Sequence, residues 1–485
     1  MSTITEHVEG DLARPGVRVT SRARATTSGD ESPTGAAFIV GETRRGPVDE
    51  PVRIRGMSDF TRHFGDRLGR SLVHDWLETF FAEGGGSAVV MRALADDAET
   101  ASVEIEDDEA NTVLVVEASS PGEWGDDLAV EIEEDGDEFD LTVLLDGRAR
   151  ERYRGLSTAE DAIDALEQSN LVVASEGDEE GTPAAGENPL DGGSDGATVE
   201  EEEITSALDL IGADWGPGQV VAPGWDGDSL EDALIEHAQD RNRRALLDPE
   251  PGSGAEDLIA QAQRVRSAAD DFGRYAALVS SWVEIPAIGR GGRRRKVPGS
   301  ALLAGKIAAG DVDAGTANNA AAGSRGEADF VVRLDTEFGG EDAYSISRRG
   351  VIWLRDDRRL GIRVYGFTTL SSDEAWRELS ISRLEMSLRA QAEEVAEDFI
   401  FRTLTGTEAL RHEFRDAVKS VLLTEYESGG LFGESPEDAF EVDVGPDVNP
   451  SEEIAKGNLR AAATIRPAPF GEYVEIDLVR KFAEQ

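Results

Sequence analysis

Residues 71–92 read SLVHDWLETFFAEGGGSAVVMR, and this stretch decides the fold. Its large apolar side chains recur at helical spacing, which predicts an amphipathic helix over residues 71–83: Leu72, Trp76, Leu77, Phe80 and Phe81. The three glycines at 84–86 end that helix, and the apolar run at 88–92 predicts a buried strand. Because an apolar run at 36–41 precedes them, we expect a strand–helix–strand unit.

Strand and helix signals alternate again after residue 205. Apolar runs at 219–224, 244–248 and 276–283 predict strands, and amphipathic patterns predict helices near 229–243 and 255–269. Alternation of this kind indicates a mostly parallel sheet with helices on its faces. We therefore expect an α/β protein of mixed α+β character, and a chain of 485 residues is long enough for about two to four domains.

The last third of the chain is expected to be more helical. Residues 361–370 predict a late strand, and a long amphipathic helix follows from about 373 to 401. A second helix is expected near 407–427, ended by two glycines. Elsewhere, Ser58 is the candidate N-cap of a shorter helix.

Charge is the strongest signal in the composition. The chain has 99 acidic and 48 basic residues, a net charge of −51, and only five of the basic residues are lysines. The periodic apolar patterns argue against disorder for most of the chain. Such acidity disfavours nucleic-acid binding, which needs a positive surface. It favours a protein that works in molar salt, where a Debye length of about 3 Å mutes repulsion between carboxylates.

Most of this imbalance lies in residues 96–205, which hold 36 acidic residues and four arginines. Alternating runs at 129–132 and 139–144 predict antiparallel strands with one solvated face. Residues 175–203 are rich in Glu, Asp, Gly and Ser, which predicts a loop or a disordered segment. We interpret the whole block as an inserted, solvent-facing acidic β domain.

Motifs for catalysis and cofactor binding fail on inspection. Residues 299–307 resemble a phosphate-binding loop, but their glycines are one residue too far apart and Ile307 replaces the magnesium-binding hydroxyl. His412 and Glu413 lack the second histidine of a metalloprotease. The chain has no cysteine, and no two of its five histidines fall at metal-ligand spacing. We expect no enzyme activity, no cofactor and no metal.

Membrane insertion and export are not expected either. No apolar run approaches the ~18–20 residues that span a bilayer. The first residues show no basic region followed by an apolar stretch, so we expect assembly in the cytoplasm.

One concentrated basic segment, GRGGRRRK, occupies residues 289–296. It is either a solvated loop that balances local charge or a docking surface for an acidic neighbour, guided by electrostatic complementarity. The candidate docking residues are Arg290, Arg293, Arg294, Arg295 and Lys296.

Several motifs, in order along the chain, resemble those of contractile tail sheath proteins. Residues 15–17 and 36–48 are similar to the family's "PGV … GFVG-x-x-x-x-GP" opening, and PGEWGD at 121–126 to its "PG-x-WGN" turn. GIRVYGFTTLSSD at 361–373, with Trp-Arg after it, is very similar to "GIRVWGARTLSSD-x-x-WR". Residues 429–450 resemble "GALFG-x-TPEEAF … NP". The family-motif residues are Gly361, Arg363, Leu370, Ser371, Ser372, Asp373, Trp376 and Arg377.

The resemblance implies a structural subunit of a myovirus-type contractile tail, and the acidity suggests a virus of halophilic archaea. Sheath proteins polymerise as stacked rings, with six subunits per ring in the family, and contract to drive an inner tube through the host envelope. The implied partners are further copies of the chain, the inner tail tube protein, and the baseplate and tail terminator proteins. The implied location is the virion tail, and the basic segment would dock the tube or a neighbouring subunit.

The resemblance also implies terminal arms that lend strands to neighbouring subunits, by β-augmentation. The arm residues are Val17, Arg18, Val19 and Thr20 near the start and Tyr473, Val474, Glu475, Ile476, Asp477, Leu478 and Val479 near the end. The predicted organisation is an arm at 1–30, an α/β core at 31–95 and 206–360, the insert at 96–205, a C-terminal sheath domain at 361–472 and a strand arm at 473–485.

Two alternatives remain open at this point. A cell-encoded contractile injection system uses a sheath of the same fold and mechanics, and the sequence does not separate it from a virus tail. An acidic α/β enzyme with atypical motifs would instead stay monomeric and gain thermal stability with a nucleotide. A surface-layer protein is disfavoured because no export signal is seen.

Overall fold

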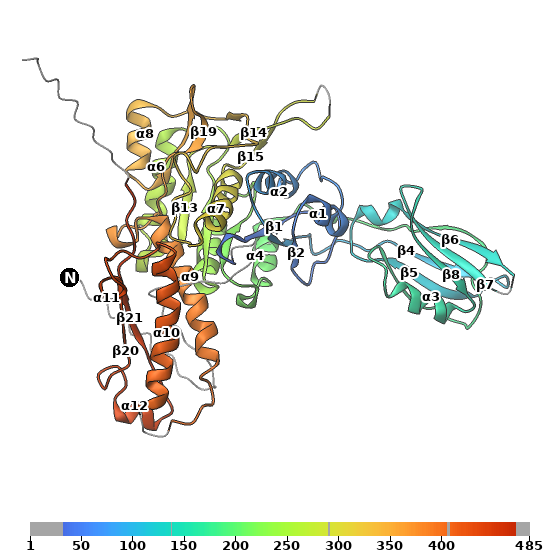
Figure 1. Ribbon diagram of the computed structural model, residues 1–485. Helices are drawn as coiled ribbons and strands as arrows, with labels where there is room; N and C mark the ends of the chain where they lie inside the picture. Colours follow the sequence, from blue (N-terminus) through green and yellow to red (C-terminus); the bar gives the residue numbers. More distant parts are fainter. Residues whose placement is uncertain (1–32, 137, 290–291, 405–407, 472–485) are drawn as a thin grey trace, which may run out of the picture. The chain divides into compact units, whose positions relative to one another are not determined.

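The computed structural model describes residues 33–136, 138–289, 292–404 and 408–471 (Figure 1). The predicted arm strands at 17–20 and 473–479, and Arg290 of the basic segment, lie outside the described residues. The chain divides into two compact units, which are described separately. The larger unit is Gly29–Ala309 with Ala321–Glu378, and the smaller is Met1–Ser28, Gly310–Ala320 and Leu379–Gln485.

A seven-stranded mixed sheet organises the larger unit. Its strand order is β17-β13-β12-β11-β1-β3-β2, and every neighbouring pair is parallel except β2 with β3. The strands are β1 (Ala37–Gly41), β2 (Val52–Ile54), β3 (Ala88–Arg92), β11 (Gly218–Val221), β12 (Arg243–Leu247), β13 (Ala276–Val279) and β17 (Val351–Ile352). Near-continuous apolar runs of this kind suit a sheet that is covered on both faces.

On one face of this sheet, alternate strand residues such as Phe38 and Val40 join a large buried core. The helices that contribute to this core are α4 (Glu201–Asp209), α5 (Asp228–Asp240), α6 (Ala255–Arg266) and α8 (Gly340–Ser347). A mixed sheet flanked by helices confirms the predicted fold class.

The helix predicted over residues 71–83 is α2 (Val73–Ala82), which contacts β1 and buries Trp76, Leu77 and Phe80. It packs directly against α7 (Ser300–Ala314). A Cβ at Gly305 of α7 would lie 2.8 Å from the carbonyl oxygen of Phe80, so only glycine permits this approach.

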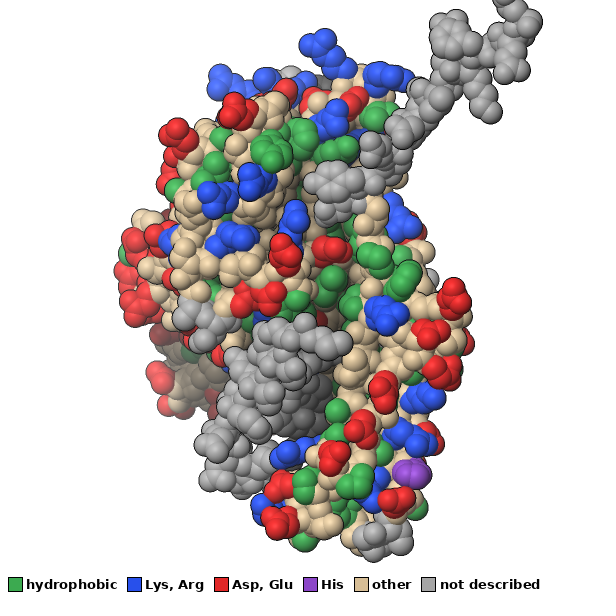
Figure 2. All heavy atoms as spheres, turned by 90° about the vertical axis from the view of Figure 1, so that its left-hand side faces the viewer, with side chains coloured by type: hydrophobic (Ala, Val, Ile, Leu, Met, Phe, Trp, Pro, Cys, Tyr) green, Lys and Arg blue, Asp and Glu red, His purple; other side chains and the backbone are tan. Residues whose placement is uncertain are grey.

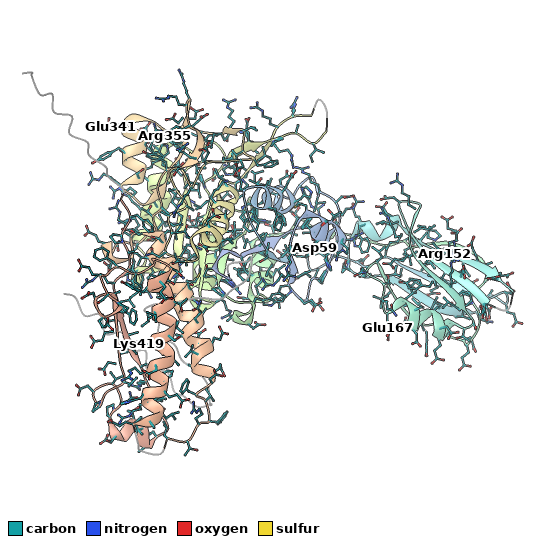
Figure 3. All side chains as sticks on the ribbon, viewed as in Figure 1. Asp59, Arg152, Glu167, Glu341, Arg355 and Lys419 are labelled. Atoms are coloured by element: carbon teal, nitrogen blue, oxygen red, sulfur yellow. The ribbon has the colours of Figure 1, made fainter. Side chains whose placement is uncertain are left out.

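The chain between β3 and α4, which we call the insert, forms two antiparallel sheets over a common core with α3 (Ala159–Leu166). Arg152 is one of its few basic side chains and pairs with Glu133 and Asp140 at 2.5 and 3.2 Å (Figure 3). The sheets are β4 (Ser102–Glu106), β5 (Thr112–Ala118) and β9 (Val172–Glu176), and β10 (Gly186–Pro189), β6 (Leu128–Asp135), β7 (Glu138–Leu145) and β8 (Arg148–Leu156).

The acidic stretch 175–203 is more ordered than its composition predicts. It contains β10, which pairs with β6, and the first turn of α4. A few buried apolar residues hold it in place, because Leu190 joins the core of the insert while Val199 joins the core of the main sheet. The predicted insert boundary at 205 therefore falls inside a helix whose Ile204 packs on the main sheet.

Other local predictions were wrong. The helix α1 (Met57–Phe64) has Gly56 as its N-cap, not Ser58, and no side chain caps it. The run 276–283 is split, because β13 ends at Val279 and β14 (Val283–Ile285) pairs in a separate sheet with β15 (Arg295–Val297) and β16 (Arg333–Leu334). The long helix predicted from residue 373 begins only at Leu379.

The smaller unit pairs two helices, α9 (Leu379–Glu397) and α10 (Ala409–Glu427), with a two-stranded sheet of β20 (Phe440–Asp443) and β21 (Ala462–Ile465). Two short helices, α11 (Pro436–Ala439) and α12 (Ser451–Ala455), accompany them. Arg383 is fully buried and pairs with Asp311, which also accepts a 2.7 Å hydrogen bond from Asn319. Among the described residues, no helix is long and apolar enough to cross a membrane.

Glu83 ties α2 to two other segments of the larger unit. Its buried carboxylate accepts hydrogen bonds of 2.8–3.0 Å from the backbone N–H groups of Asp329, Phe330 and Val331. The ammonium of Lys306 on α7 lies 2.8 Å away. Removing this carboxylate would leave three backbone N–H groups, the buried one of Val331 among them, without their acceptor, and Lys306 would keep only Asp329 as an ion-pair partner. Unsatisfied buried groups and unpaired charges are costly.

We expect Glu83→Ala to lower the free energy of unfolding by about 3 kcal/mol or more. Glu83→Gln keeps an acceptor oxygen and should lose less. Urea unfolding at constant salt measures both, with the exposed Glu50→Ala as the control. Equal midpoints for Glu83→Ala and Glu50→Ala would contradict the proposed role of Glu83.

Candidate interaction surfaces

The first residues of the family motif form one strand of a hairpin, β18 (Leu354–Asp357) with β19 (Gly361–Val364). Gly361 has φ +74°, a left-handed conformation that suits glycine at the end of this turn. The Arg363 side chain is mostly buried and pairs with Glu327 at 3.1 Å. These two motif residues therefore serve the local structure.

The second half of the motif, residues 370–377, is a hydrogen-bonded turn that packs against the core of the main sheet. Leu370 is fully buried in that core. The Ser371 hydroxyl donates to Asp271 at 2.7 Å and accepts from the N–H of Asp373, whose carboxylate caps the N–H of Ala375 at 2.9 Å. This cap begins a 3-10 turn at Glu374–Trp376, which explains why no α-helix starts at residue 373. Burial raises the pKa of Asp271.

Other residues of the same motif are accessible to solvent. Ser372 and Arg377 are exposed, and the guanidinium of Arg274 lies 5.1 Å from the Trp376 ring centre. The motif thus combines residues that shape a turn with residues that a partner can reach.

Most of the described basic segment is engaged within the chain. Arg294 pairs with Glu284 at 3.3 Å, and Lys296 pairs with Asp335 at 2.6 Å. Arg295, whose side chain is only 11% exposed, pairs with Asp75 and Glu78 at 2.6 and 2.7 Å. Arg293 is exposed. Docking through this segment would therefore rest on Arg293 and the exposed parts of Arg294 and Lys296.

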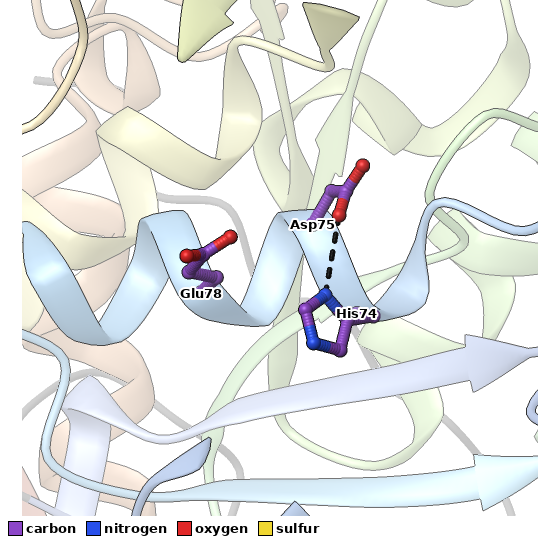
Figure 4. Close-up of side chains that lie close together, drawn as sticks. All are labelled: His74, Asp75 and Glu78. Carbon is purple, nitrogen blue, oxygen red and sulfur yellow. Dashed lines mark hydrogen bonds and ion pairs between the residues drawn. The ribbon is translucent and has the colours of Figure 1, made fainter. Parts of the chain in front are cut away.

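The carboxylates that hold Arg295 belong to a cluster on α2 in which His74, Asp75 and Glu78 lie within metal-ligand distance (Figure 4). Two guanidiniums already occupy Asp75, because Arg67 binds it at 2.8 Å as well as Arg295. Burial alone would raise the pKa of Asp75, but hydrogen bonds from His74 and Arg67 and the charge of Arg295 bring it well below its usual range. A cation here would face two positive charges, so we interpret the cluster as ion pairs that join α2 to β15.

The glycine-rich stretch 299–307 forms the start of α7, where a phosphate would bind if it were a nucleotide loop. A carboxylate already occupies this helix end, because Asp248 at the end of β12 accepts from the N–H of Ser300 at 2.8 Å. Burial raises the pKa of Asp248 to about 7. An internal acid therefore satisfies this N-terminus.

The raised pKa of Asp248 predicts a pH dependence of stability. In the unfolded chain the group loses its proton near pH 4, whereas in the folded chain it does so near pH 7. Because the folded state holds this proton more tightly, the group stabilises the fold fully below pH ~4. That stabilisation is lost as the pH rises to ~7, by up to ~1.4 kcal/mol of unfolding free energy per pH unit.

We expect Asp248→Asn to remove this slope while keeping the oxygen that accepts from Ser300. Free energies of unfolding measured between pH 4 and 8 test it as the difference from wild type, with the exposed Asp49→Asn as the control. Parallel curves for wild type and Asp248→Asn would refute the assignment.

Comparison with solved structures gives the fold class. The sheath tail protein from Listeria innocua matches with a TM-score of 0.62 at 15% identity, covering 87% of this chain and 90% of that chain. The sheath tail protein from Desulfitobacterium hafniense matches with a TM-score of 0.56 at 16% identity, covering 88% and 93%. The helical sheath of the anti-feeding prophage in its contracted state matches with a TM-score of 0.57 at 16% identity, covering 99% and 100%.

No protein-family model matches the chain, and no curated protein matches it in sequence. The chain therefore has the fold of the sheath proteins of contractile tails and injection systems. The likeness extends over most of each chain and includes both compact units.

Proposed function

We propose that this chain is the subunit of a contractile sheath. It polymerises with copies of itself as stacked rings around an inner tube, with six subunits per ring, and contracts to drive the tube through the envelope of a host cell. The observation that carries the proposal is the shared fold over 99% of the chain with a sheath solved in helical form. The role is structural rather than enzymatic, as the solved neighbours are sheath proteins and a carboxylate occupies the helix end at Ser300.

The smaller unit offers an acceptor for the predicted arm strands. In the described part of this unit, β20 pairs only with β21, and a two-stranded sheet is marginally stable by itself. A strand from a neighbouring copy, Val17–Thr20 or Tyr473–Val479, would satisfy the open N–H and C=O groups along its edges. Contacts of this heterologous kind build a filament that does not close.

No nucleotide is required for contraction if the extended sheath is kinetically trapped at higher free energy. Arms that keep their strand pairing while the bodies rotate would hold the subunits together during this change. The further partners in this proposal are the inner tail tube, the baseplate and the tail terminator proteins. Arg293, with the exposed parts of Arg294 and Lys296, is the part of the basic segment proposed to dock the tube or a neighbour.

A virus tail, built in the host cytoplasm, and a cell-encoded injection system remain distinct forms of this function. The second has one observation in its favour. The anti-feeding prophage baseplate in contracted state and the contracted sheath of an extracellular contractile injection system each cover 97–99% of this chain, against 87–88% for the two bacterial sheath tail proteins. Neighbouring genes for a capsid and a terminase would decide for the virus.

The acidity of the chain leads to a proposal about its solvent, that of a salt-adapted virus or cell. With a net charge of −51, copies repel one another unless salt screens them. We expect the full chain, expressed alone, to form tubes in molar salt and to remain as single subunits near ~0.15 M salt. Negative-stain microscopy at both salt concentrations tests this, and single subunits alone in molar salt would refute the proposed function.

The arm model makes a separate prediction. A chain that ends at residue 472 should fold with an unchanged circular dichroism spectrum but fail to form tubes in molar salt, because it lacks the C-terminal donor strand. A chain with the same thirteen positions replaced by a Gly/Ser sequence controls for length. Tubes of normal length from either variant would refute strand exchange at this end.

A further inference from the structure

Arginine side chains gather on the larger unit at a place that the sequence does not mark. Four of them, which we call the arginine cluster, come from three segments: Arg266 ends α6, Arg348 and Arg349 follow α8, and Arg377 follows the 3-10 turn. Figure 2 shows blue side chains spread over the upper part of one face, with hydrophobic and some acidic side chains between them. Arg348, Arg349 and Arg377 are exposed, and Arg266 is half-buried.

Hydrogen bonds from Thr368 and Thr369 join two of these segments, the one after α8 and the one after the 3-10 turn. The Thr368 hydroxyl donates to the carbonyl of Gly350 at 3.0 Å, and the Thr369 N–H donates to the carbonyl of Arg377 at 2.8 Å. Burial, then the positive charges of Arg349 and Arg377, lower the pKa of Arg266. The geometry agrees for Arg266 and the turn that carries Arg349, because a Cβ at Gly350 would lie 3.4 Å from a guanidinium nitrogen of Arg266.

The four arginines have no carboxylate within ion-pair distance in the part of the chain that the structure describes. Asp271 lies near Arg266 and partly offsets the repulsion, but its carboxylate accepts its hydrogen bond from the Ser371 hydroxyl. The neutral side chain of Gln263 faces Arg349. By contrast, Arg264, two residues before Arg266, pairs with Asp228, Glu231 and Asp232.

The chain has about two carboxylates for every basic residue, so most exposed arginines could find one nearby. Four neighbouring arginines without an ion pair within the described ranges therefore indicate a binding surface. Like charges held together with only one partial counter-charge raise the free energy of the isolated subunit. An incoming carboxylate would relieve that repulsion, and guanidiniums bind carboxylates in a bidentate manner.

Aromatic side chains border the arginine cluster. Tyr344 on α8 is 63% exposed, and the guanidinium of Arg348 lies 5.6 Å from its ring centre. Trp376 precedes Arg377 in the sequence, and the guanidinium of Arg274 lies over its ring. On the hairpin of β18 and β19, Arg355 is labelled in Figure 3. Its guanidinium lies 5.0 Å from the ring centre of Tyr365, which is 45% exposed. Arginine with tyrosine and tryptophan is the composition of residues that dominate binding at protein interfaces.

We propose that the arginine cluster is a contact between subunits, which binds a carboxylate-rich surface on a second copy of this chain. The proposal rests on the proposed function, in which copies associate. A second copy supplies the required chemistry, because every copy carries 99 acidic residues. In molar salt only charges in direct contact still attract each other. The arginine cluster and the carboxylates would therefore stabilise the bound state without speeding the encounter of two copies.

Charge reversal tests the arginine cluster. We expect Arg349→Glu/Arg377→Glu to raise the critical concentration for tube formation in molar salt about tenfold or more, as for lost charge pairs at an interface. The control is Arg148→Glu/Arg150→Glu on β8 of the insert, which makes the same charge change at two exposed arginines that have no ion pair among the described residues. The neutral variant Arg349→Gln/Arg377→Gln, expected to lie between, serves if the reversed chain fails to fold.

If the wild type forms tubes and both reversed chains assemble at the same concentration, the inference is wrong and the proposed function stands. If the wild type itself never associates, the proposed function and the inference fail together. A folded, tube-forming wild type with a selective defect in the cluster variant supports both.

Cross-linking identifies the occupant. Because the chain has no cysteine, Ser267→Cys places a single thiol on an exposed position next to Arg266 while all four arginines remain. Labelled with a benzophenone maleimide and illuminated in molar salt, the full chain should give a copy-to-copy adduct that maps to an acidic peptide. The same protein diluted below the assembly threshold should give none. Adducts only to a co-expressed inner-tube protein, or no adduct at all, would overturn the proposal.

Discussion

The larger unit depends on the complete burial of β1. Its residues Ala37, Phe38 and Ile39 are fully buried, and β3 and β11 pair with it in parallel on either side. Both faces and both edges of this strand are therefore occupied, so its backbone groups are satisfied only when its neighbours along the sheet are in place. The chain passes from β1 to β3 on one side and reaches β11 on the other only after the insert. Because loops connect the insert to the rest of the larger unit, the insert can form its own acidic β structure without changing the main sheet.

Arginine serves the interior of this protein as well as its surface. Arg92 donates to the carbonyls of Gly46 and Pro121, and Arg243 donates to those of Ile211 and Gly216. Burial lowers the pKa of Arg92 to about 10 and that of Arg243 to about 9, so both keep their charge at neutral pH. A planar guanidinium reaches several carbonyl oxygens at once, which a single ammonium on a flexible stem does less well. This explains why most of the buried cations among the described residues are arginines.

Those parts of the fold that have their own periodicity were predictable from sequence. The helix at 71–83 and its flanking strands each show an apolar pattern long enough to assign. The start of α4 was hidden because three glutamates precede its first apolar core residue, Ile204, and an acidic composition is typical of a loop. The break after Val279 was missed because Trp282 and Val283 follow two small serines, so the apolar run appeared continuous. In the fold both serines are buried, and the Ser280 hydroxyl accepts from the N–H of Leu354.

Surface contacts were harder to predict than elements, and the reason is topological. The basic segment 289–296 was visible as composition, but its pairing with Asp75 joins residues 220 positions apart. The arginine cluster is invisible in the sequence because α6, α8 and the family motif contribute one or two residues each. Conversely, the acidic residues are evident from the sequence, but they are too numerous to indicate where a partner binds. In the proposed sheath, a group of uncompensated cations from several segments is best used where copies meet, since attraction at longer range is screened in molar salt and repulsion dominates without it. In such a chain, a place where unpaired arginines from several segments meet beside exposed aromatic side chains is therefore more informative than the total charge.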